Sequence, residues 1–439
     1  ELFPKGQQSL PGFNVELEPD NQNVAAVLAK AGYATGMVGK FHVGPSLSDP
    51  KFRKRYGLHE IEKNVPFTEA LNRRKYENEK GYRKAVKDFG FTWAKNIYWD
   101  NTKAPFQNHN PEWTAAAAVE FIEQHKEEPF YLHYCTTLLH GPNGSWYKSL
   151  DKPKVTGEGI IKEDLKVLPP RNSVMKRIEA AGLTSNQAGY LWMDDSLGLI
   201  LDKLDELKLT QNTLVLFIAD HGSGNKGSLY TSKGTEVPCI MRWPAGMKSG
   251  IRSRELIQNT DFVPTWFELA NAKKPAKYLM DGTSLTPLFK QPHKPVRKHV
   301  YAEIGAARSI KTKTHSYIAL RYTKEQVTGV KERHRRHLKA LTGLSGGVSR
   351  SIATHPHAYT GDQLYDLEHD PDAQRNLAGS SSHAAVLRQL KQNLAMELKR
   401  FPERPYGEFV PGGNALPGKG YDEVFETLRK AAATKKKKK

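Results

Sequence analysis

Three segments with helical patterns in this chain are each followed directly by an apolar run of strand length. The helical segments have apolar residues at helical spacing and carry helix start or stop signals. The helix–strand pairs are 23–33 with 35–39, 110–126 with 129–139, and 186–209 with 213–220. Repetition of helix and then strand favours parallel strands covered by helices. We therefore predict an α/β fold with a mostly parallel central sheet flanked by helices on both faces.

The pattern of apolar and polar residues changes after about residue 290. Residues 299–322 alternate as antiparallel strands do, a basic stretch follows at 324–351, and 383–401 has the pattern of one amphipathic helix. The last residues are rich in Pro and Gly and then in Lys, which is typical of a flexible tail. We expect three parts: a main domain over 1–295, a smaller C-terminal α+β subdomain over 296–405, and a flexible basic tail over 406–439.

The charge balance of the chain points to an anionic partner. The 439 residues include 66 Lys and Arg against 47 Asp and Glu, a formal net charge of +19. Such a balance suits nucleic acid, anionic lipid, or a sulfated or phosphorylated substrate. No recognised nucleic-acid-reading motif is found, and no stretch is long and apolar enough to span a membrane. The two cysteines, Cys135 and Cys239, form neither a disulfide framework nor a metal-finger spacing.

A polar pair stands where the first apolar run ends. Lys40 and His42 are two residues apart in "GMVGKFHVG", between Gly39 and Gly44. Residues i and i+2 of an extended chain point to the same side, so a cation and an imidazole project together. The glycines remove side-chain bulk and allow close approach to the backbone. A strand that simply ends in a solvated loop would look the same, so this pair alone does not establish a site.

The other apolar runs also end in residues that carry chemistry. Asp220 and His221 follow one run, and His140 follows another. Lys226 and Lys233 lie in the loop after Asp220. In open α/β sheets, ligands bind outside the carboxyl ends of the strands, and a carboxylate there is a hard ligand for a divalent cation. Lysines, histidines and a metal ligand together suit a compact polyanion, as in phosphoryl or sulfuryl transfer.

Several motifs, in order, resemble the formylglycine-dependent sulfatases of the alkaline phosphatase superfamily. "NVAAVLAKAGYATGMVGKFHVG" is similar to that family's Ala-Gly-Tyr-x-Thr and Gly-Lys-Trp-His-x-Gly signature, with Phe41 in place of Trp. "NTLVLFIADHG", "KGSLYTSKGTEVPCIMRWPAG", "TDFVPTWFELA", "MDGTSLTPLF" and "LYDLEHDPDAQRNLA" follow in the family's order. The resemblance runs from about residue 20 to about 400. It implies an alkaline phosphatase-like fold, with 1–295 as the catalytic domain, and hydrolysis of a sulfate ester, expected to be a carbohydrate sulfate.

The resemblance implies roles for individual residues. Lys40 resembles the lysine that binds a sulfate oxygen and the nucleophile, and His42 the histidine that orients the nucleophile or takes its proton. His140 resembles the histidine that donates to the leaving oxygen. Lys226 resembles the second sulfate lysine, with Lys233 as a weaker competitor because the loop is one residue longer than usual.

The resemblance also implies a metal site. Asp220 resembles a metal ligand, and His221 occupies the adjacent position, where many members have Asn. The family's metal is usually calcium and sometimes magnesium. We therefore expect a divalent metal, with Ca²⁺ favoured over Mg²⁺.

The chain departs from the family in one serious respect. Members carry a Cys/Ser-x-Pro-x-Arg motif, whose first residue becomes the formylglycine nucleophile, and an upstream Asp-Asp pair of metal ligands. This sequence contains neither, since Cys135 precedes "TTLLH" and Cys239 precedes "IMRW". We expect that an N-terminal segment with these elements is missing and that the chain by itself is inactive.

Alternatives remain open at this point. A phosphate mono- or diesterase on the same fold would share much of the site, and a pseudoenzyme that binds sulfated glycan would need no nucleophile. A nucleic-acid-binding role ranks last. By family resemblance the protein is expected to be periplasmic or secreted, although no signal peptide is present in the sequence.

Overall fold

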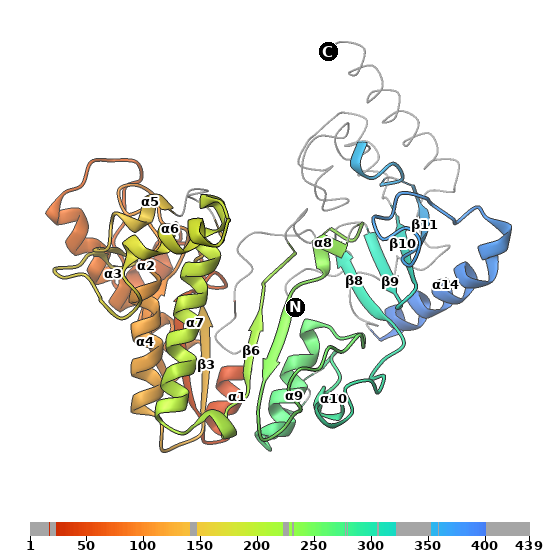
Figure 1. Cartoon of the computed structure of the whole chain (residues 1–439), viewed down its shortest axis with the longest axis horizontal. Helices are drawn as coiled ribbons and strands as arrows, with labels where there is room; N and C mark the ends of the chain where they lie inside the picture. Colours follow the sequence, from red (N-terminus) through yellow and green to blue (C-terminus); the bar gives the residue numbers. More distant parts are fainter. Residues whose placement is uncertain are drawn as a thin grey trace, which may run out of the picture.

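The structure is a computed structural model that describes residues 17, 23–140, 147–222, 228–230, 232–276, 278, 280–304, 307–321, 353–358 and 360–400. The expected tail over 406–439, the basic stretch 324–351 and Lys226 lie outside the described residues. The main part contains α1 (Val24–Lys30), β1 (Ala34–Lys40), α2 (Pro50–Tyr56), α3 (Glu69–Asp88), β2 (Trp93–Tyr98), α4 (Pro111–Gln124), β3 (Phe130–Cys135), α5 (Tyr147–Leu150), β4 (Val155–Thr156), β5 (Gly159–Ile160), α6 (Arg171–Ala180), α7 (Ala188–Glu206), β6 (Val215–Ile218), α8 (Ser232–Thr235), β7 (Cys239–Arg242), α9 (Phe262–Leu269) and α10 (Thr286–Lys290). Figure 1 labels most of these elements.

A parallel sheet forms the centre of the first half of the chain. Its strand order is β2-β1-β3, and β1 pairs Gly36 with Trp93 of β2 and with Leu132 of β3. The residues of β1 from Ala34 to Gly39 are all buried, as expected for a parallel strand covered on both faces. The predicted α/β class with a parallel sheet is confirmed for this half.

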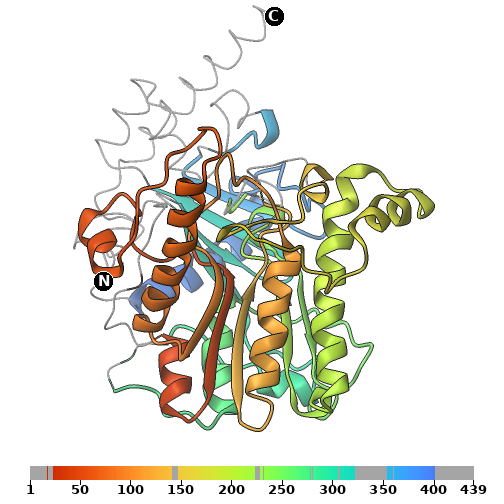
Figure 2. The ribbon, with the colours of Figure 1, turned by 90° about the vertical axis from the view of Figure 1, so that its left-hand side faces the viewer.

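Helices cover both faces of this sheet. On one face, Phe121 of α4 and Leu204 of α7 belong to a buried cluster that includes Leu132 of β3. In Figure 2 this half of the molecule faces the viewer, with α4 and α7 next to each other. On the other face, Tyr82 of α3 packs in a cluster with Met37 of β1, and α2 joins the same cluster. β1 therefore lies between two hydrophobic clusters, and this packing positions its last residue.

The third predicted strand departs from the expected parallel arrangement. β6 pairs antiparallel with β7, and within the described residues no strand joins β6 to β3. The residues of β3 and β6 are only partly buried, apart from one exposed residue in β3. Figure 1 shows β6 and β7 between β3 and a second, antiparallel sheet. Apolar periodicity identifies a strand but does not specify its neighbour, and here the chain returns from β6 to form its own partner strand.

The second sheet is antiparallel and belongs to the C-terminal part. It contains β8 (Val300–Ile304), β9 (Ala307–Lys311), β10 (His315–Leu320) and β11 (Asp362–Asp366) in the order β11-β10-β9-β8. Helix α14 (Ala384–Lys399) places Leu390, Leu394 and Leu398 in a buried cluster with Ile310 and Leu364. The leucines are spaced at four residues, so one face of the amphipathic helix covers this sheet.

Two smaller expectations concern cysteines and membranes. Cys135 and Cys239 are free thiols, both half-buried. Among the described residues, no helix combines the length and apolar character that crossing a membrane requires.

Gly39 has the backbone conformation that positions Lys40 at the end of β1. Its φ is +90°, and the register between β1 and β2 shifts between Val38 and Gly39. An added Cβ would lie 2.0 Å from the carbonyl oxygen of Cys135 on β3. We expect Gly39→Ala to lower the free energy of unfolding by about 2–5 kcal/mol, since overpacking and positive-φ strain add.

Gly32→Ala is a matched control for this change. Gly32 has a φ of +89°, but an added Cβ there would meet nothing within 4 Å. It should therefore show only the positive-φ cost of about 1–2 kcal/mol. Urea unfolding of both variants measures the difference. Equal effects would mean that contact with the β3 carbonyl contributes nothing.

Candidate active site

A pocket lies at the carboxyl ends of the parallel strands. Lys40 ends β1, Tyr98 ends β2, and Thr137 and His140 follow β3. The pocket is lined by Lys40, Tyr98, Asp100, Asn101, Thr102, Gln107, Asn108, His109, Thr137 and His140. This is the edge at which ligands bind in open α/β sheets. Two of the residues predicted from the sequence, Lys40 and His140, therefore line one pocket.

His42 lies beside this pocket. Its Nε2 is 3.6 Å from Oδ1 of Asp100, which is itself one of the lining residues. The residue between Lys40 and His42 is buried: Phe41 packs against Phe89 and Trp99, with ring centroids 5.9 and 5.2 Å away. The backbone N–H of Phe41 also donates to the carbonyl oxygen of Tyr98 at 2.8 Å, so ring packing and this hydrogen bond together fix the direction of the chain beyond Lys40.

His140 lies in a turn that is positioned by packing of a neighbouring residue into the hydrophobic core. Leu138 is buried in that cluster, and Leu139 has a φ of +69°. The backbone N–H of His140 donates to the carbonyl oxygen of Thr137 at 3.4 Å. The turn brings both Thr137 and His140 to the wall of the pocket.

His109 is a lining residue that the sequence interpretation missed. Its backbone N–H donates to Oγ of Ser149 at 3.1 Å, and its Nδ1 is 3.0 Å from Oγ1 of Thr137. The side chain is buried. In the sequence His109 directly precedes the "NP" that begins α4, and this was interpreted only as a helix start. The signal available for a site was a histidine directly before a helix start. Nothing in the nearby sequence indicates that Thr137 contacts its side chain.

The electrostatics of the pocket keep His109 neutral. Burial lowers the pKa of its imidazole to about 4, and the neighbouring His140 and the Lys40 cation act in the same direction. A backbone hydrogen bond involving His140 opposes this in part. At neutral pH, His109 is therefore an uncharged hydrogen-bonding group next to a permanent cation.

A chain of contacts ties His109 to the core behind it. The hydroxyl oxygen of Ser149 accepts from the His109 backbone N–H, and its carbonyl oxygen accepts from Nη1 of Arg171 at 2.9 Å. Arg171 contacts both carboxylate oxygens of buried Glu112, at 2.9 and 2.7 Å. Trp192 of α7 donates its indole N–H to the same carboxylate at 3.2 Å. This network holds the start of α4 against α6 and α7.

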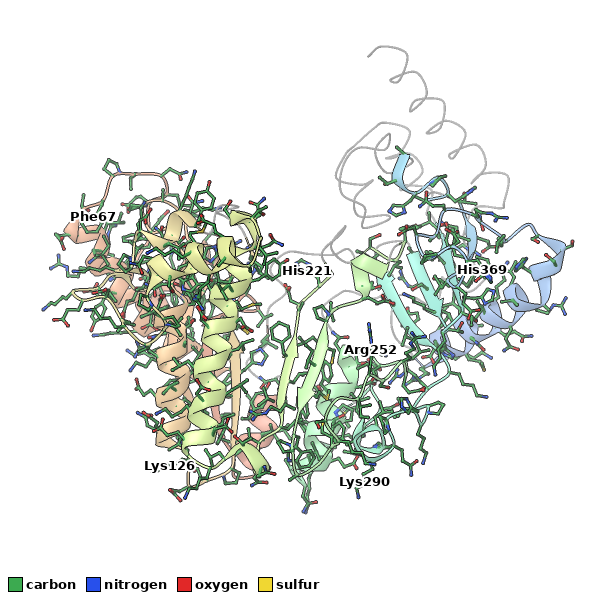
Figure 3. The ribbon with its side chains drawn as sticks, viewed as in Figure 1. Phe67, Lys126, His221, Arg252, Lys290 and His369 are labelled. Atoms are coloured by element: carbon green, nitrogen blue, oxygen red, sulfur yellow. The ribbon has the colours of Figure 1, made fainter. Side chains whose placement is uncertain are left out.

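Asp220 and His221 follow the end of β6. Neither is among the residues that line the pocket. The Asp220 side chain is 80% exposed, and its carboxylate is 3.6 Å from Nε2 of His221, whose Nδ1 is 2.8 Å from the carbonyl oxygen of Gly222. In Figure 3, His221 is labelled just beyond the end of β6. β6 pairs with β7 and, among the described residues, does not extend the sheet of β1.

The described residues do not by themselves make a metal site. They contain no group of three or more His, Cys, Asp or Glu side chains arranged to hold a metal ion. Ca²⁺ takes six to eight oxygen ligands, whereas Asp220 and His221 offer one carboxylate and one imidazole. We therefore assign no step of any reaction to a metal. Lys226 and the side chain of Lys233 lie outside the described residues.

Comparison with known proteins assigns the family. The profile of the family described as Sulfatase matches residues 4–272, which is more than half of the chain. A second profile, described as N-sulphoglucosamine sulphohydrolase, C-terminal, matches residues 219–326. The chain belongs to the sulfatase family, the formylglycine-dependent group that its motifs resemble.

Curated relatives agree with this assignment. An ulvan-active sulfatase of Formosa agariphila is 26% identical over 340 residues, which is 73% of this chain and 62% of that protein. Arylsulfatase A of Homo sapiens is 24% identical over 89% of this chain and 72% of its own length. An arylsulfatase of Hemicentrotus pulcherrimus is 25% identical, with 55% of it covered. The chain thus spans only about three fifths of the length of the first relatives it matches.

Solved structures share the fold. One, from work on the metabolism of multiple glycosaminoglycans by Bacteroides thetaiotaomicron, has a TM-score of 0.56 at 18% identity and covers 90% of this chain and 84% of its own. Another, in complex with its substrate D-glucosamine-2-N,6-O-disulfate, has a TM-score of 0.50 at 16% identity, with 88% of this chain and 83% of its own covered. These likenesses support the predicted alkaline phosphatase-like architecture.

Proposed function

We propose that this protein is a sulfuric ester hydrolase that removes sulfate from a carbohydrate sulfate ester. The observation that carries the proposal is the meeting of Lys40 and His140, from two separate strand ends, in one pocket. Neutral amide side chains, Asn101, Gln107 and Asn108, line the same pocket and suit the hydroxyl groups of a sugar. Membership of the sulfatase family supports the reaction type, and relatives named for ulvan and for a glucosamine disulfate support the substrate class.

Each predicted residue has a role in this proposal. Lys40 binds a sulfate oxygen and balances the charge that develops on it. His42 accepts the proton of the attacking hydroxyl, and its contact with Asp100 orients the imidazole for this. His140 donates a proton to the alcohol oxygen as the ester S–O bond breaks and a new S–O bond forms. Lys226, with Lys233 as competitor, is proposed as the second sulfate-binding lysine.

The nucleophile is proposed to come from a segment outside this sequence. The hydrate of a formylglycine side chain there would supply the attacking hydroxyl, since no Cys/Ser-x-Pro-x-Arg motif occurs among the 439 residues. The described pocket residues then bind, orient and move protons around that group.

The reaction is tested in a longer form of the protein that contains the motif. We expect Lys40→Ala to lower kcat/KM for an aryl sulfate about 10²–10³-fold, the usual effect of removing one group that stabilises developing negative charge. Lys95→Ala is the matched control. Lys95 lies on neighbouring β2 and pairs with Glu120 at 2.5 Å, outside the pocket. Its activity should stay within twofold.

The alternatives have distinct outcomes in the same assay. If phosphate is released from the matching aryl phosphate faster than sulfate is released from the aryl sulfate, a phosphate mono- or diesterase is favoured. Binding of sulfated sugar with no turnover of either ester by the longer form would favour a pseudoenzyme.

A divalent metal, Ca²⁺ or else Mg²⁺, is proposed to bind Asp220 and His221 together with ligands from the same outside segment. In the longer form we expect Asp220→Ala to weaken Ca²⁺ binding at least about tenfold, because a carboxylate is the strongest of these ligands. The unfolding free energy should change little, since the side chain is 80% exposed. Calorimetric titration with Ca²⁺ measures the affinity. Asp202→Ala, an exposed carboxylate of α7, is the control, and equal affinities in the two variants would show that Asp220 is not a ligand.

Localisation and other partners are also proposals. One relative is named an extracellular sulfatase, and this supports a periplasmic or secreted protein. The +19 charge is assigned to the polyanionic substrate and not to specific nucleic-acid binding. Recovery of the protein only in the cytoplasmic fraction of its source cells would refute the first proposal. Sequence-dependent DNA binding would refute the second.

A further inference from the structure

The pocket contains a buried polar atom that the fold leaves without a hydrogen bond. His109 is 3% exposed, and its Nε2 has no hydrogen-bond partner among the described residues. The opposite ring nitrogen, Nδ1, is 3.0 Å from Oγ1 of Thr137. An unpaired buried polar group costs about 1–3 kcal/mol, so the fold keeps this nitrogen at an energetic cost.

The ring and the backbone around it are held by several hydrogen bonds. Thr137 contacts Nδ1, Ser149 accepts from the His109 backbone, and Asn110, the next residue, caps α4 by accepting from the Trp113 N–H at 3.1 Å. Asn110 also donates to the carbonyl oxygens of Pro153 and Val155, at 2.7 and 3.1 Å. Rotation of the imidazole away from this position would break its contact with Thr137. The backbone of His140 also acts on this ring, but no described protein atom makes a hydrogen bond with Nε2, so a ligand in the pocket can supply one.

The surroundings indicate which kind of ligand atom this is. Lys40 and His140 line the same pocket and suit the sulfate group, whereas His109 is uncharged at neutral pH. Its sequence neighbour Asn108 is also neutral and lines the pocket. An uncharged imidazole beside an amide suits a hydroxyl group, which can both donate and accept.

We propose that His109 determines substrate specificity by a hydrogen bond from its Nε2 to a hydroxyl of the sugar that carries the sulfate. Thr137 selects the ring orientation, and Lys40 and His140 hold the ester beside it. The inference rests on the proposed function and names the sugar-contacting part of that site. A site that hydrogen-bonds a hydroxyl discriminates strongly against ligands that lack it.

Calorimetric titration of the chain 1–439 tests this without turnover. Three sugar sulfates are titrated first: glucosamine 6-sulfate, galactose 6-sulfate and N-acetylgalactosamine 4-sulfate. The one that binds most tightly and inorganic sulfate are then the two probes. We expect His109→Phe to weaken binding of the sugar sulfate about tenfold and to leave binding of inorganic sulfate within twofold. His109→Gln, whose amide reaches a similar position, should retain affinity within threefold. His125→Phe, at the far end of α4, is the matched control and should change neither affinity.

Imidazole ¹⁵N spectra of the unmodified chain give a readout that needs no variant. Addition of the sugar sulfate should shift the Nε2 resonance of His109 and leave its Nδ1 resonance in place, whereas inorganic sulfate should shift neither. This keeps the inference testable even if the phenylalanine variant fails to fold.

The outcomes separate the inference from the proposed function. Unchanged sugar-sulfate affinity in His109→Phe, or no shift of Nε2, would overturn the inference and leave the proposed function intact. Equal weakening of sugar sulfate and inorganic sulfate would also overturn it, because the ring would then only position Lys40 or His140. Failure of the unmodified chain to bind any of the three sugar sulfates would count against the proposed function, and the inference would fall with it.

Discussion

The chain 1–439 on its own is expected to release sulfate from an aryl sulfate at least about 10⁴-fold more slowly than a longer form carrying the Cys/Ser-x-Pro-x-Arg motif, because loss of a covalent nucleophile typically costs this much or more in kcat. Neither cysteine begins such a motif, since Cys135 precedes "TTLLH" and Cys239 precedes "IMRW". The measurement is turnover with both proteins purified from a host that has no sulfatase.

The longer form with the first residue of its motif replaced by Ala is the control. It should be as inactive as the chain 1–439, which would assign the loss to the nucleophile and not to length. Comparable turnover by the short chain and the longer form would contradict the expectation. It would mean that a residue within this sequence attacks the ester.

The second large effect concerns stability. We expect Arg171→Ala to lower the free energy of unfolding by about 3–5 kcal/mol, because it leaves a buried carboxylate without its partner. Glu112 is 3% exposed and receives both of its short contacts from this guanidinium. Arg171 also stacks over Trp192 at 4.8 Å and donates to the Ser149 carbonyl oxygen. Chemical denaturation followed by tryptophan fluorescence measures the change.

Two further variants separate charge from packing. Arg53→Ala removes one partner of an exposed pair, in which Glu60 is 78% exposed, and should cost less than about 1 kcal/mol. Replacing both Glu112 and Arg171 by Leu and Met should recover most of the loss, since an apolar pair of similar volume is often as stable as a buried ion pair. A double variant as unstable as Arg171→Ala alone would show that the hydrogen bonds to Trp192 and Ser149 dominate.

Local sequence patterns were sufficient for much of this protein. The alternation of helix and strand, the burial of β1 and the position of Lys40 at its end all follow from periodicity and from residues near one another in the chain. The family assignment also comes from the sequence, because several motifs in order are specific even where single ones are not. Hydrophobic spacing determines which face of an element is buried, and this requires no knowledge of the neighbouring elements.

Tertiary structure alone decided which of these elements meet. The sequence predicted that 213–220 forms a strand, but its pairing with β7 in place of the parallel sheet depends on competition between strand edges. Asp220 and His221, which follow β6, are not among the residues that line the pocket of Lys40 and His140.

His109 shows the same division most clearly. Next to "NP" it marks only the start of a helix, and it becomes part of the pocket because Thr137 and Ser149 are brought to it from 28 and 40 residues away. Contacts of that separation are made by packing of whole elements, and no local pattern encodes them. The sequence by itself determined the pairs α1–β1 and α4–β3, the family and the end of β1. The assembly of the pocket depended on the packing of β3, α4 and α6 around it.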